Sequence, residues 1–306
     1  MTAESSRTAR PKRTGEQSAD VAIVGLGPVG SNLARHALEL DCKVAGFDAA
    51  GAPDDLVSMG LVALRDKPAI RRVVGKPRLV LLYLQPGPGV DEALDELAAI
   101  LGPDDVVADG SNSYWRDSLR RAERMKKKGI DLIDIGTSGG TCGARHGACF
   151  MVGGERAAVA RAEPLLARLA VPGGFAHAGG PGAGHYAKLV HDGVEAGMMQ
   201  AIGEGIALLE RYPGGLPVAG VLNCWRHGSV IRSWLIELMH EAYRAQGGLA
   251  AARTEDRREV NLLVDDALRM EVAVPVIAQS VIQRIASKDR SEAAANAVEM
   301  MRNALK

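Results

Sequence analysis

Four ionisable side chains lie close together in the segment GHYAKLVHDGVEAGMMQ, residues 184–200, in which apolar and small residues dominate. They are Lys188, His191, Asp192 and Glu195. Positions three and four residues apart share one face of a helix, so the spacing predicts a helix with a polar stripe. Its apolar residues are expected to pack into protein from the other faces. Charged groups in such surroundings need partners or a task, and a salt-bridged stripe and a proton-transfer site are the alternatives.

A glycine-rich loop with GxGxxG spacing follows the first apolar run of the chain, DVAIVGLGPVG. It comes after a predicted strand and opens a predicted helix, which is the context in which this spacing indicates a dinucleotide site. Gly25 permits a tight turn, Gly27 lets the backbone approach a pyrophosphate, and Gly30 allows close packing of helix on strand. We expect the cofactor to be held by Gly25, Leu26, Gly27, Pro28, Val29 and Gly30.

Asp48 ends the second predicted strand. A carboxylate there can accept hydrogen bonds from both hydroxyls of an adenosine ribose, and it would repel the additional phosphate of NADP. The residues that follow, AAG at 49–51, include no arginine for that phosphate. The expected cofactor is therefore NAD rather than NADP. The alternative is an acid in a solvated loop.

A second glycine cluster occupies DIGTSGGTCGARHGACFMVGG, residues 134–154. Ser138, Gly139 and Gly140 place consecutive backbone N–H groups and a hydroxyl at the end of a predicted strand, where ligands bind in open α/β sheets. From these residues alone, a loop without a ligand is equally acceptable.

Together these segments resemble the 6-phosphogluconate dehydrogenases, in their short form, within the wider β-hydroxyacid dehydrogenase family. The matching segments are GLGPVG, DGSNS at 109–113, the second glycine cluster, the helix at 184–200, HGSVIRSWL at 227–235, and DDALRMEVAVPVIAQSVIQRIASK at 265–288. The resemblance covers the chain from about Val21 to Lys306. It implies a Rossmann-type domain followed by helices that dimerise. It also implies oxidation of a hydroxyl β to a carboxylate, followed by loss of CO₂.

The resemblance also implies roles for residues at matching positions. Lys188 is the general base that takes the hydroxyl proton, and Glu195 is the general acid that protonates the carbon losing CO₂. The implied substrate contacts are Asn112, Ser138, Gly139, Gly140, His191, Asp192, Arg232 and Arg302. Among these, Arg232 matches a phosphate-binding arginine. Gln85 and Asn112 complete the expected cofactor contacts.

Three departures from the family pattern concern the substrate. The family's VHNG is VHDG here, so Asp192 replaces an amide and can only accept hydrogen bonds. Ala196 replaces a tyrosine that helps to bind the substrate phosphate. Arg302 matches the tail arginine, but the family's FGGH-like continuation has no counterpart in MMRNALK. An unpaired Asp192 would lower affinity for 6-phosphogluconate by about one or two decades.

The substrate and the reaction therefore stay open at this point. We expect 6-phosphogluconate or a related small anionic β-hydroxy acid. One alternative is a non-decarboxylating β-hydroxyacid dehydrogenase or keto-acid reductase acting on a phosphorylated or phosphonate substrate. Another is an NAD-binding protein without catalysis, although the presence of both Lys188 and Glu195 argues against it.

Strands alternate with helices as far as about residue 180, which predicts an α/β fold with a parallel, doubly wound sheet. Beyond it, helices are predicted at 186–211, about 217–245, about 256–270 and 275–303. The expected organisation is a disordered tail at 1–18, an NAD-binding domain at 19–180, and a helical substrate and dimerisation domain at 181–306.

Composition limits the classes of function. The 306 residues are 47% hydrophobic with a formal net charge of +0, which argues against nucleic-acid binding. No apolar run reaches the roughly 18 residues of a membrane span. The four cysteines form no CxxC pair and the histidines are scattered, so we expect free thiols, no metal site and a cytoplasmic location. The expected assembly is a homodimer or a dimer of dimers.

Overall fold

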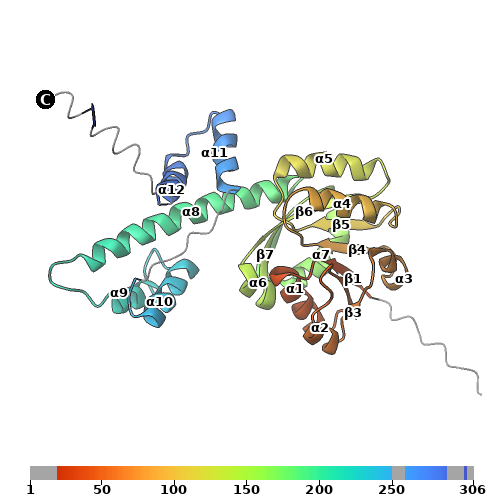
Figure 1. Ribbon diagram of the computed structural model, residues 1–306, viewed down its shortest axis with the longest axis horizontal. Coiled ribbons are helices and arrows are strands. Elements are labelled where there is room, and N and C mark those ends of the chain that lie inside the picture. The colour runs from red at the N-terminus through yellow and green to blue at the C-terminus, as the bar shows by residue number, and fades with distance from the viewer. Residues whose placement is uncertain (1–18, 250–258, 288–299, 302–306) are drawn as a thin grey trace, which may run out of the picture. The chain divides into compact units, whose positions relative to one another are not determined.

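The computed structural model describes residues 19–249, 259–287 and 300–301. The expected tail at 1–18 and the candidate substrate residue Arg302 lie outside these ranges. The chain divides after Lys188 into two compact units (Figure 1), which we call the sheet unit and the helical unit.

The sheet unit contains an eight-stranded sheet in the order β3-β2-β1-β4-β5-β6-β7-β8. The first six strands in this order are parallel, as expected, and follow the 3-2-1-4-5-6 order of a Rossmann-type fold. The strands are β1 (Val21–Val24), β2 (Val44–Phe47), β3 (Val62–Ala63), β4 (Leu79–Leu82), β5 (Val106–Asp109), β6 (Asp131–Ser138), β7 (Ala148–Gly153) and β8 (Ala170–Gly179).

Helices cover both faces of this sheet (Figure 1). Alternate strand residues point to opposite faces, so Ile23 belongs to a core with helices α1, α6 and α7, whereas Val24 belongs to a core with α3, α4 and α5. Burial on both faces explains why these strands are continuous apolar runs. The helices are α1 (Pro28–Glu39), α2 (Asp54–Ser58), α3 (Ile70–Val73), α4 (Pro88–Ala98), α5 (Trp115–Lys126), α6 (Gly140–His146) and α7 (Arg156–Leu169), with a 3-10 turn at Lys67–Ala69.

The carboxyl ends of three parallel strands, β1, β4 and β5, lie side by side in register, and β6 continues past them to Ser138. Val24 pairs with Leu82, Leu82 with Asp109, and Asp109 with Asp134. The loops that follow these strands therefore leave the same edge of the sheet. This edge is where an open α/β sheet binds its ligands.

Three strands were not predicted: β7, β8 and the two-residue strand β3. β7 runs antiparallel to β6, and β8 then pairs in parallel with β7. The sequence of β8, AVPGGFAHAG, contains a proline and three glycines, which obscured the strand pattern, and β7, ACFMVG, lies within the second glycine cluster. β3 has only two residues and gives no periodic signal.

The helical unit begins within α8 (Ala183–Glu210), which is a single helix of 28 residues. α9 (Val218–Trp225), α10 (Trp234–Gln246), α11 (Glu259–Arg269) and α12 (Pro275–Ala286) follow. The expected helix at 217–245 is thus two helices, because the chain turns at 226–233 and Ser233 caps α10 by accepting a hydrogen bond from the Ile236 N–H. α12 ends at Ala286, before the predicted end at 303, although residues 300–301 are again helical.

The exposure of the side chains on α8 differs from the expectation that its apolar residues pack into protein. Asp192 is buried, at 4% exposure, whereas Val190, Val194 and Met198 are 36%, 49% and 43% exposed. These apolar residues, four positions apart, form a stripe that is exposed among the described residues. Within the described ranges, no helix is long and apolar enough to cross a membrane.

Candidate active site

The first glycine loop connects β1 to α1 and is shaped by close backbone contacts. Gly25 has φ +96°, and a Cβ atom there would lie 2.2 Å from the Tyr83 carbonyl oxygen. A Cβ on Gly30 would lie 2.0 Å from the Gly25 oxygen, so the helix can start this close to the strand only with glycine. Gly27 is exposed, and a Cβ there would meet no atom within 4 Å. The loop therefore has an open backbone position at a helix start, which fits a pyrophosphate.

Asp48 lies beside this loop at the end of β2. Its Oδ2 accepts a hydrogen bond from the Leu26 N–H at 2.7 Å, and its Oδ1 accepts one from the Ala50 N–H at 2.9 Å. The carboxylate is thus held in one orientation by the glycine loop itself. Each oxygen keeps a further lone pair for a ligand hydroxyl.

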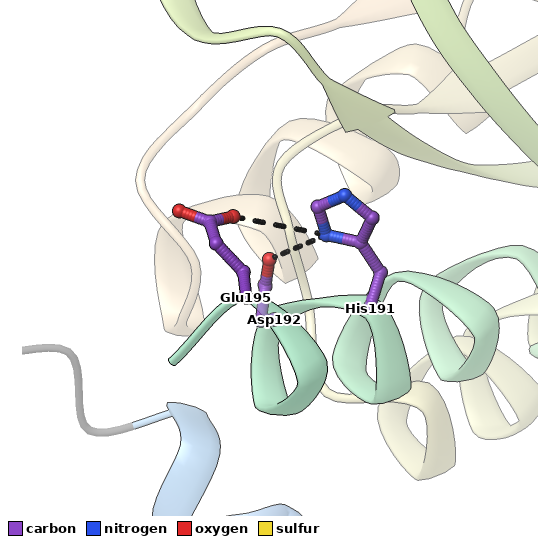
Figure 2. A group of neighbouring side chains, drawn as sticks. All are labelled: His191, Asp192 and Glu195. Carbon is purple, nitrogen blue, oxygen red and sulfur yellow. Dashed lines mark hydrogen bonds and ion pairs between the residues drawn. The ribbon is translucent and has the colours of Figure 1, made fainter. Parts of the chain in front are cut away.

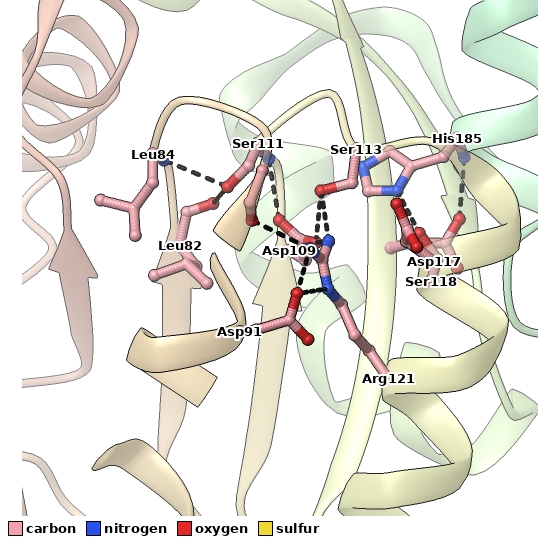
Figure 3. Close-up of polar contacts among 12 residues, drawn as sticks. Leu82, Leu84, Asp91, Asp109, Ser111, Ser113, Asp117, Ser118, Arg121 and His185 are labelled. Atoms are coloured by element: carbon pink, nitrogen blue, oxygen red, sulfur yellow. Dashed lines mark hydrogen bonds and ion pairs between the residues drawn. The ribbon is translucent and has the colours of Figure 1, made fainter. Parts of the chain in front are cut away.

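A buried carboxylate organises the loop DGSNS that follows β5 (Figure 3). Asp109 Oδ1 accepts from the Ser111 N–H at 3.0 Å, and Asp109 Oδ2 accepts from the Ser113 hydroxyl at 3.0 Å. The Ser111 hydroxyl accepts from the Leu84 N–H at 3.1 Å, which ties this loop to the one after β4. Asn112 lies between the two buried serines, is exposed, and has φ +52°. This left-handed conformation is uncommon for a non-glycine residue and persists because its neighbours are fixed.

Arg121 of α5 supports the same loop from below (Figure 3). It is 1% exposed, donates to the Ser113 hydroxyl at 2.8 Å, and lies 3.6 Å from Asp109 Oδ2. It also donates to Asp91 Oδ2 of α4 at 2.8 Å. Burial alone would raise the pKa of Asp91, but hydrogen bonds from Arg121 and Arg120 lower it to about 2. Asp109 and Arg121 were not predicted as site residues; the partners of Arg121 lie on other elements, whereas Asp109 bonds to two serines of its own segment.

The second glycine loop connects β6 to α6. Gly139 and Gly140 have φ +114° and +58°, and a Cβ on Gly139 would lie 2.9 Å from the Gly143 Cα. A Cβ on Gly140 would meet no atom within 4 Å. Just before the loop, the Thr137 hydroxyl is 3.0 Å from the hydroxyl of Tyr83, whose pKa is raised by burial. The loop therefore begins from a fixed strand end and has an open backbone position, as the first loop does.

Close backbone contacts fix Lys188 on the sheet unit. A Cβ on Gly136 of β6 would lie 2.5 Å from the Lys188 Cβ. One turn earlier in α8, a Cβ on Gly184 would lie 2.5 Å from the backbone oxygens of both Asp134 and Met151. Lys188 therefore stands directly on the strand that leads to the Ser138 loop.

Asp134 anchors the first turn of α8. Its Oδ1 accepts from the Gly182 N–H at 2.7 Å, and its Oδ2 accepts from the His185 N–H at 2.8 Å. The His185 ring is buried, with Nδ1 2.7 Å from the Ser118 hydroxyl. A carboxylate at a helix start satisfies N–H groups that have no partner in the helix. Neither residue was predicted, although Asp134 could have been suspected as an acid inside an apolar strand.

Farther along α8, three ionisable side chains converge within the helical unit (Figure 2). His191 Nδ1 is 3.2 Å from Asp192 Oδ1 and 3.8 Å from Glu195 Oε2. The ligand atoms of the three residues all lie within 4.8 Å of one another, close enough to hold a cation. The sequence predicted the polar stripe to which these residues belong, but it gave no indication of a metal site. Because Lys188, Asp192 and Glu195 are four and three residues apart in one helix, α8 itself aligns them along one face.

The remaining predicted residues differ in their placement. Gln85 is exposed in the loop between β4 and α4, at the same edge as the glycine loops. Arg232 is exposed in the helical unit, between α9 and α10. The sheet unit thus brings together the predicted residues of its own loops.

Two family models match the chain over most of its length. One, described as the NAD binding domain of 6-phosphogluconate dehydrogenase, matches residues 20–178. The other, the C-terminal domain of 6-phosphogluconate dehydrogenase, matches residues 184–305. The two matches show a pyridine-nucleotide-binding domain followed by a second domain, and this order agrees with the sheet unit and the helical unit of the fold.

Individual relatives agree with these models. A Bacillus subtilis protein, YqeC, provisionally named a 6-phosphogluconate dehydrogenase, is 36% identical over 92% of this chain and 96% of its own. An NAD(+)-dependent, decarboxylating 6-phosphogluconate dehydrogenase of Haloferax volcanii is 37% identical over 87% of this chain and 90% of its own. The structure of Plasmodium falciparum 6-phosphogluconate dehydrogenase superposes with a TM-score of 0.78 at 24% identity, covering 88% of this chain and 62% of that one. The chain is therefore a pyridine-nucleotide-binding oxidoreductase that belongs to the 6-phosphogluconate dehydrogenase family.

Proposed function

We propose that this protein oxidises a small anionic β-hydroxy acid with NAD and then releases CO₂ from the product, with Lys188 as the general base and Glu195 as the general acid. The observation that carries this proposal is the position of Lys188. The close contact between Gly136 and the Lys188 Cβ supports the proposal, because the lysine side chain starts beside the strand that ends at the Ser138 loop. In this proposal, the proton acceptor Lys188 lies near the loop Ser138–Gly140, whose backbone N–H groups can donate hydrogen bonds to the substrate.

The cofactor would be held by the loop from Gly25 to Gly30, with Asp48 at the ribose and Gln85 and Asn112 along its length. The oriented carboxylate of Asp48 favours NAD over NADP, since it can accept from both ribose hydroxyls and would repel a phosphate. NAD, when bound, supplies the acceptor for the hydrogen that leaves the substrate carbon with its electron pair.

Lys188 then has two tasks. It takes the proton from the substrate hydroxyl as the carbonyl forms, and its ammonium afterwards stabilises the enolate oxygen produced by the loss of CO₂. Glu195 donates a proton to the carbon that carried the carboxylate. Ser138, Gly139 and Gly140 would hold the carboxylate and hydroxyl end through hydroxyl and backbone N–H groups.

The substrate could differ from 6-phosphogluconate because of Asp192. Its carboxylate is buried, with Oδ1 3.2 Å from His191 Nδ1, and a carboxylate has no hydrogen-bond donor for a substrate carboxylate. This observation favours, as a second candidate, a non-decarboxylating β-hydroxyacid dehydrogenase or keto-acid reductase. His191, Arg232 and Arg302 are the other proposed substrate contacts, with Arg232 and Arg302 suited to an anionic end.

Lys188→Met tests the assignment of the base. NADH formation is followed with 6-phosphogluconate and a panel of hydroxy acids and phosphonates, and CO₂ is trapped in parallel. The variant is expected to lose about 10²–10⁴-fold in kcat while NAD binding is kept. Near-normal turnover would refute the role of Lys188. NADH formation without CO₂ would select the non-decarboxylating reaction instead.

A further inference from the structure

A buried histidine on α10 is hydrogen-bonded to the residue that follows α9. His240 is 4% exposed, and its Nδ1 lies 2.9 Å from Nη1 of Arg226. The two helices lie side by side in the helical unit (Figure 1). An arginine can only donate hydrogen bonds. His240 Nδ1 is therefore the acceptor, and the proton of the neutral ring is on Nε2.

This hydrogen bond spans the turn that carries Arg232. The turn, residues 226–233, begins at Arg226, which is the C-cap of α9, and ends at Ser233, which is the N-cap of α10. Within it, the N–H of Arg232 donates to the Ser229 carbonyl oxygen at 3.1 Å. The bond to His240 thus joins the first residue of the turn to the middle of α10, and it restricts the backbone on which Arg232 stands.

Burial and nearby cations keep the His240 ring neutral around pH 8. Burial lowers the pKa of His240 below the ordinary value of an imidazole, the positive charges of Arg226 and Arg244 lower it further, and Glu241 acts in the opposite direction. The titratable groups that face this ring from α9 and α10 are Arg226, His227, Glu241 and Arg244, and the acid of α8 that bonds to α10 is Glu210.

A protonated His240 cannot keep its hydrogen bond to Arg226. Imidazolium has an N–H on both ring nitrogens and no acceptor, so Nδ1 and the guanidinium would meet as two donors. The two groups would also carry like charges, which repel each other. In acid, the turn 226–233 therefore loses this cross-link to α10.

We propose that His240 is a positioning residue whose neutral ring holds Arg226, and through it the turn 226–233, so that Arg232 binds the anionic end of the substrate, and that protonation of the ring releases the turn in acid. The part that concerns Arg232 rests on the proposed function, in which this arginine contacts the substrate. The hydrogen bond and the tautomer depend only on α9 and α10.

Long-range ¹⁵N–¹H correlation spectra without substrate test the hydrogen bond, with His240→Asn to identify the resonances. At about pH 8, wild type is expected to show His240 protonated at Nε2, and its titration midpoint is expected below the ordinary imidazole value near 6.5. Arg226→Met is expected to raise the midpoint by more than Arg244→Met, the matched control, which also removes a nearby positive charge.

A ring protonated at Nδ1 in wild type, or equal midpoints in wild type and Arg226→Met, would overturn the pairing. Should Arg226→Met fail to fold, the wild-type spectrum decides. A ring that stays neutral down to the pH of unfolding would refute release in acid.

Two replacements of His240 separate its acceptor from its bulk. Asparagine puts an oxygen at the δ position and does not titrate, whereas leucine fills similar space and has no acceptor. Dissociation constants for 6-phosphogluconate and for inorganic phosphate are measured by calorimetry in the presence of NADH, so that no oxidation occurs. At pH 8, His240→Leu is expected to bind about tenfold more weakly, the equivalent of one hydrogen bond, and His240→Asn about as wild type does.

The link to Arg232 is tested by combining substitutions. In protein that carries Arg232→Met, His240→Leu is expected to cause no further loss of affinity. A further tenfold loss would show that His240 acts elsewhere. If wild type binds neither compound at pH 8, the anion site at Arg232 is refuted.

Release in acid is read from the ratio of the dissociation constants of wild type and His240→Asn, because this ratio cancels the titration of the ligand and of every other group. From pH 8 to one unit below the measured midpoint, the ratio is expected to rise about five- to tenfold. A constant ratio, or binding by His240→Asn as weak as that by His240→Leu, would overturn the proposal. The ratio needs no leucine variant, so it decides if His240→Leu does not fold. None of these measurements needs turnover, so failure of the proposed function would be seen separately, as the absence of NADH formation with every acid.

Discussion

Asp109 shows how a buried carboxylate can fix the conformation of a loop without itself being exposed to a ligand. Its two oxygens hold the backbone of Ser111 and the hydroxyl of Ser113, and Arg121 balances its charge. Asn112 is thereby kept in a left-handed conformation between two fixed neighbours. The backbone of Asn112 is therefore already in place before any ligand arrives, which lowers the entropy cost of binding.

Asp48 provides the first residue-scale prediction. Asp48→Ser removes the charge and one acceptor oxygen, so kcat/KM with NAD is expected to fall about 10- to 100-fold, while kcat/KM with NADP falls much less. The ratio of the two values, measured by initial rates, is the readout. Asp54→Ser, at an exposed position nearby, makes the same change in charge and should leave the ratio unchanged. An unaltered ratio in Asp48→Ser would show that Asp48 does not select the cofactor.

At the scale of elements, α8 is located on the sheet by backbone contact and by a cap. Gly136 and Gly184 allow helix and strands to touch, and Asp134 closes the first turn. No long side chain is needed for this attachment. The position of Lys188 therefore follows from where the helix starts.

Gly184→Ala is expected to destabilise the protein by about 1–3 kcal/mol, because its Cβ would overlap two carbonyl oxygens. Gly203→Ala is the matched control in the same helix, since a Cβ there meets no atom within 4 Å. It should be neutral or stabilise by up to about 1 kcal/mol. Urea unfolding measures both. Equal effects of the two substitutions would show that α8 does not need the close approach.

The contact between α4 and α5 predicts how the stability of the protein changes at low pH. The folded-state pKa of Asp91 is about 2, below the reference value of 3.8. Its contribution to stability is therefore complete above about pH 4 and is lost as the pH falls toward 2. The expected loss is about 2 kcal/mol. It is measured as the difference in unfolding free energy between wild type and Asp91→Asn across this range, and a constant difference would contradict the assigned pKa.

The elements could be predicted where local sequence determines them. Gly25, Gly27 and Gly30 follow an apolar run, and the structure has the expected strand, turn and helix there. β8 could not be predicted, because a strand with a proline and several glycines depends on pairing with β7. The break between α9 and α10 was signalled by Gly228 and Ser233, but the surrounding apolar residues suggested one helix.

The site residues divide in the same way. Lys188 and Glu195, the proposed base and acid, are visible in the sequence because they interrupt an apolar helix. Asp134 and Arg121 act through partners that only the fold brings near, whereas Asp109 contacts two serines of its own segment. The pairing of His191 with Asp192 depends on side-chain orientation, which helical spacing alone does not determine.

At the scale of the whole molecule, the helical unit has apolar surface that the single chain leaves open. Besides Val190, Val194 and Met198 on α8, α11 and α12 expose Leu268 at 73% and Val276 at 67%. Exposed apolar side chains gathered on several helices of one unit are typical of subunit interfaces. The expected homodimer would cover them.

Val190→Glu combined with Val194→Glu is expected to convert a dimer into a monomer, because two charges would be buried without partners. Light scattering after size exclusion gives the mass. Val57→Glu, at an exposed valine on α2 of the sheet unit, is the control and should leave the dimer intact. A monomeric wild type, or a dimeric double variant, would refute an interface on this stripe of α8.

The backbone contacts at Gly136, Gly153 and Gly184 also have an evolutionary consequence. A Cβ on Gly153 would lie 2.5 Å from the Gly184 nitrogen, so these positions tolerate no side chain. Because they attach the helix upstream of Lys188, later helix positions are not required to hold it in place. If Lys188 is the proton acceptor that we propose, substitutions at proposed recognition positions such as Asp192 and Ala196 can change the substrate without displacing it.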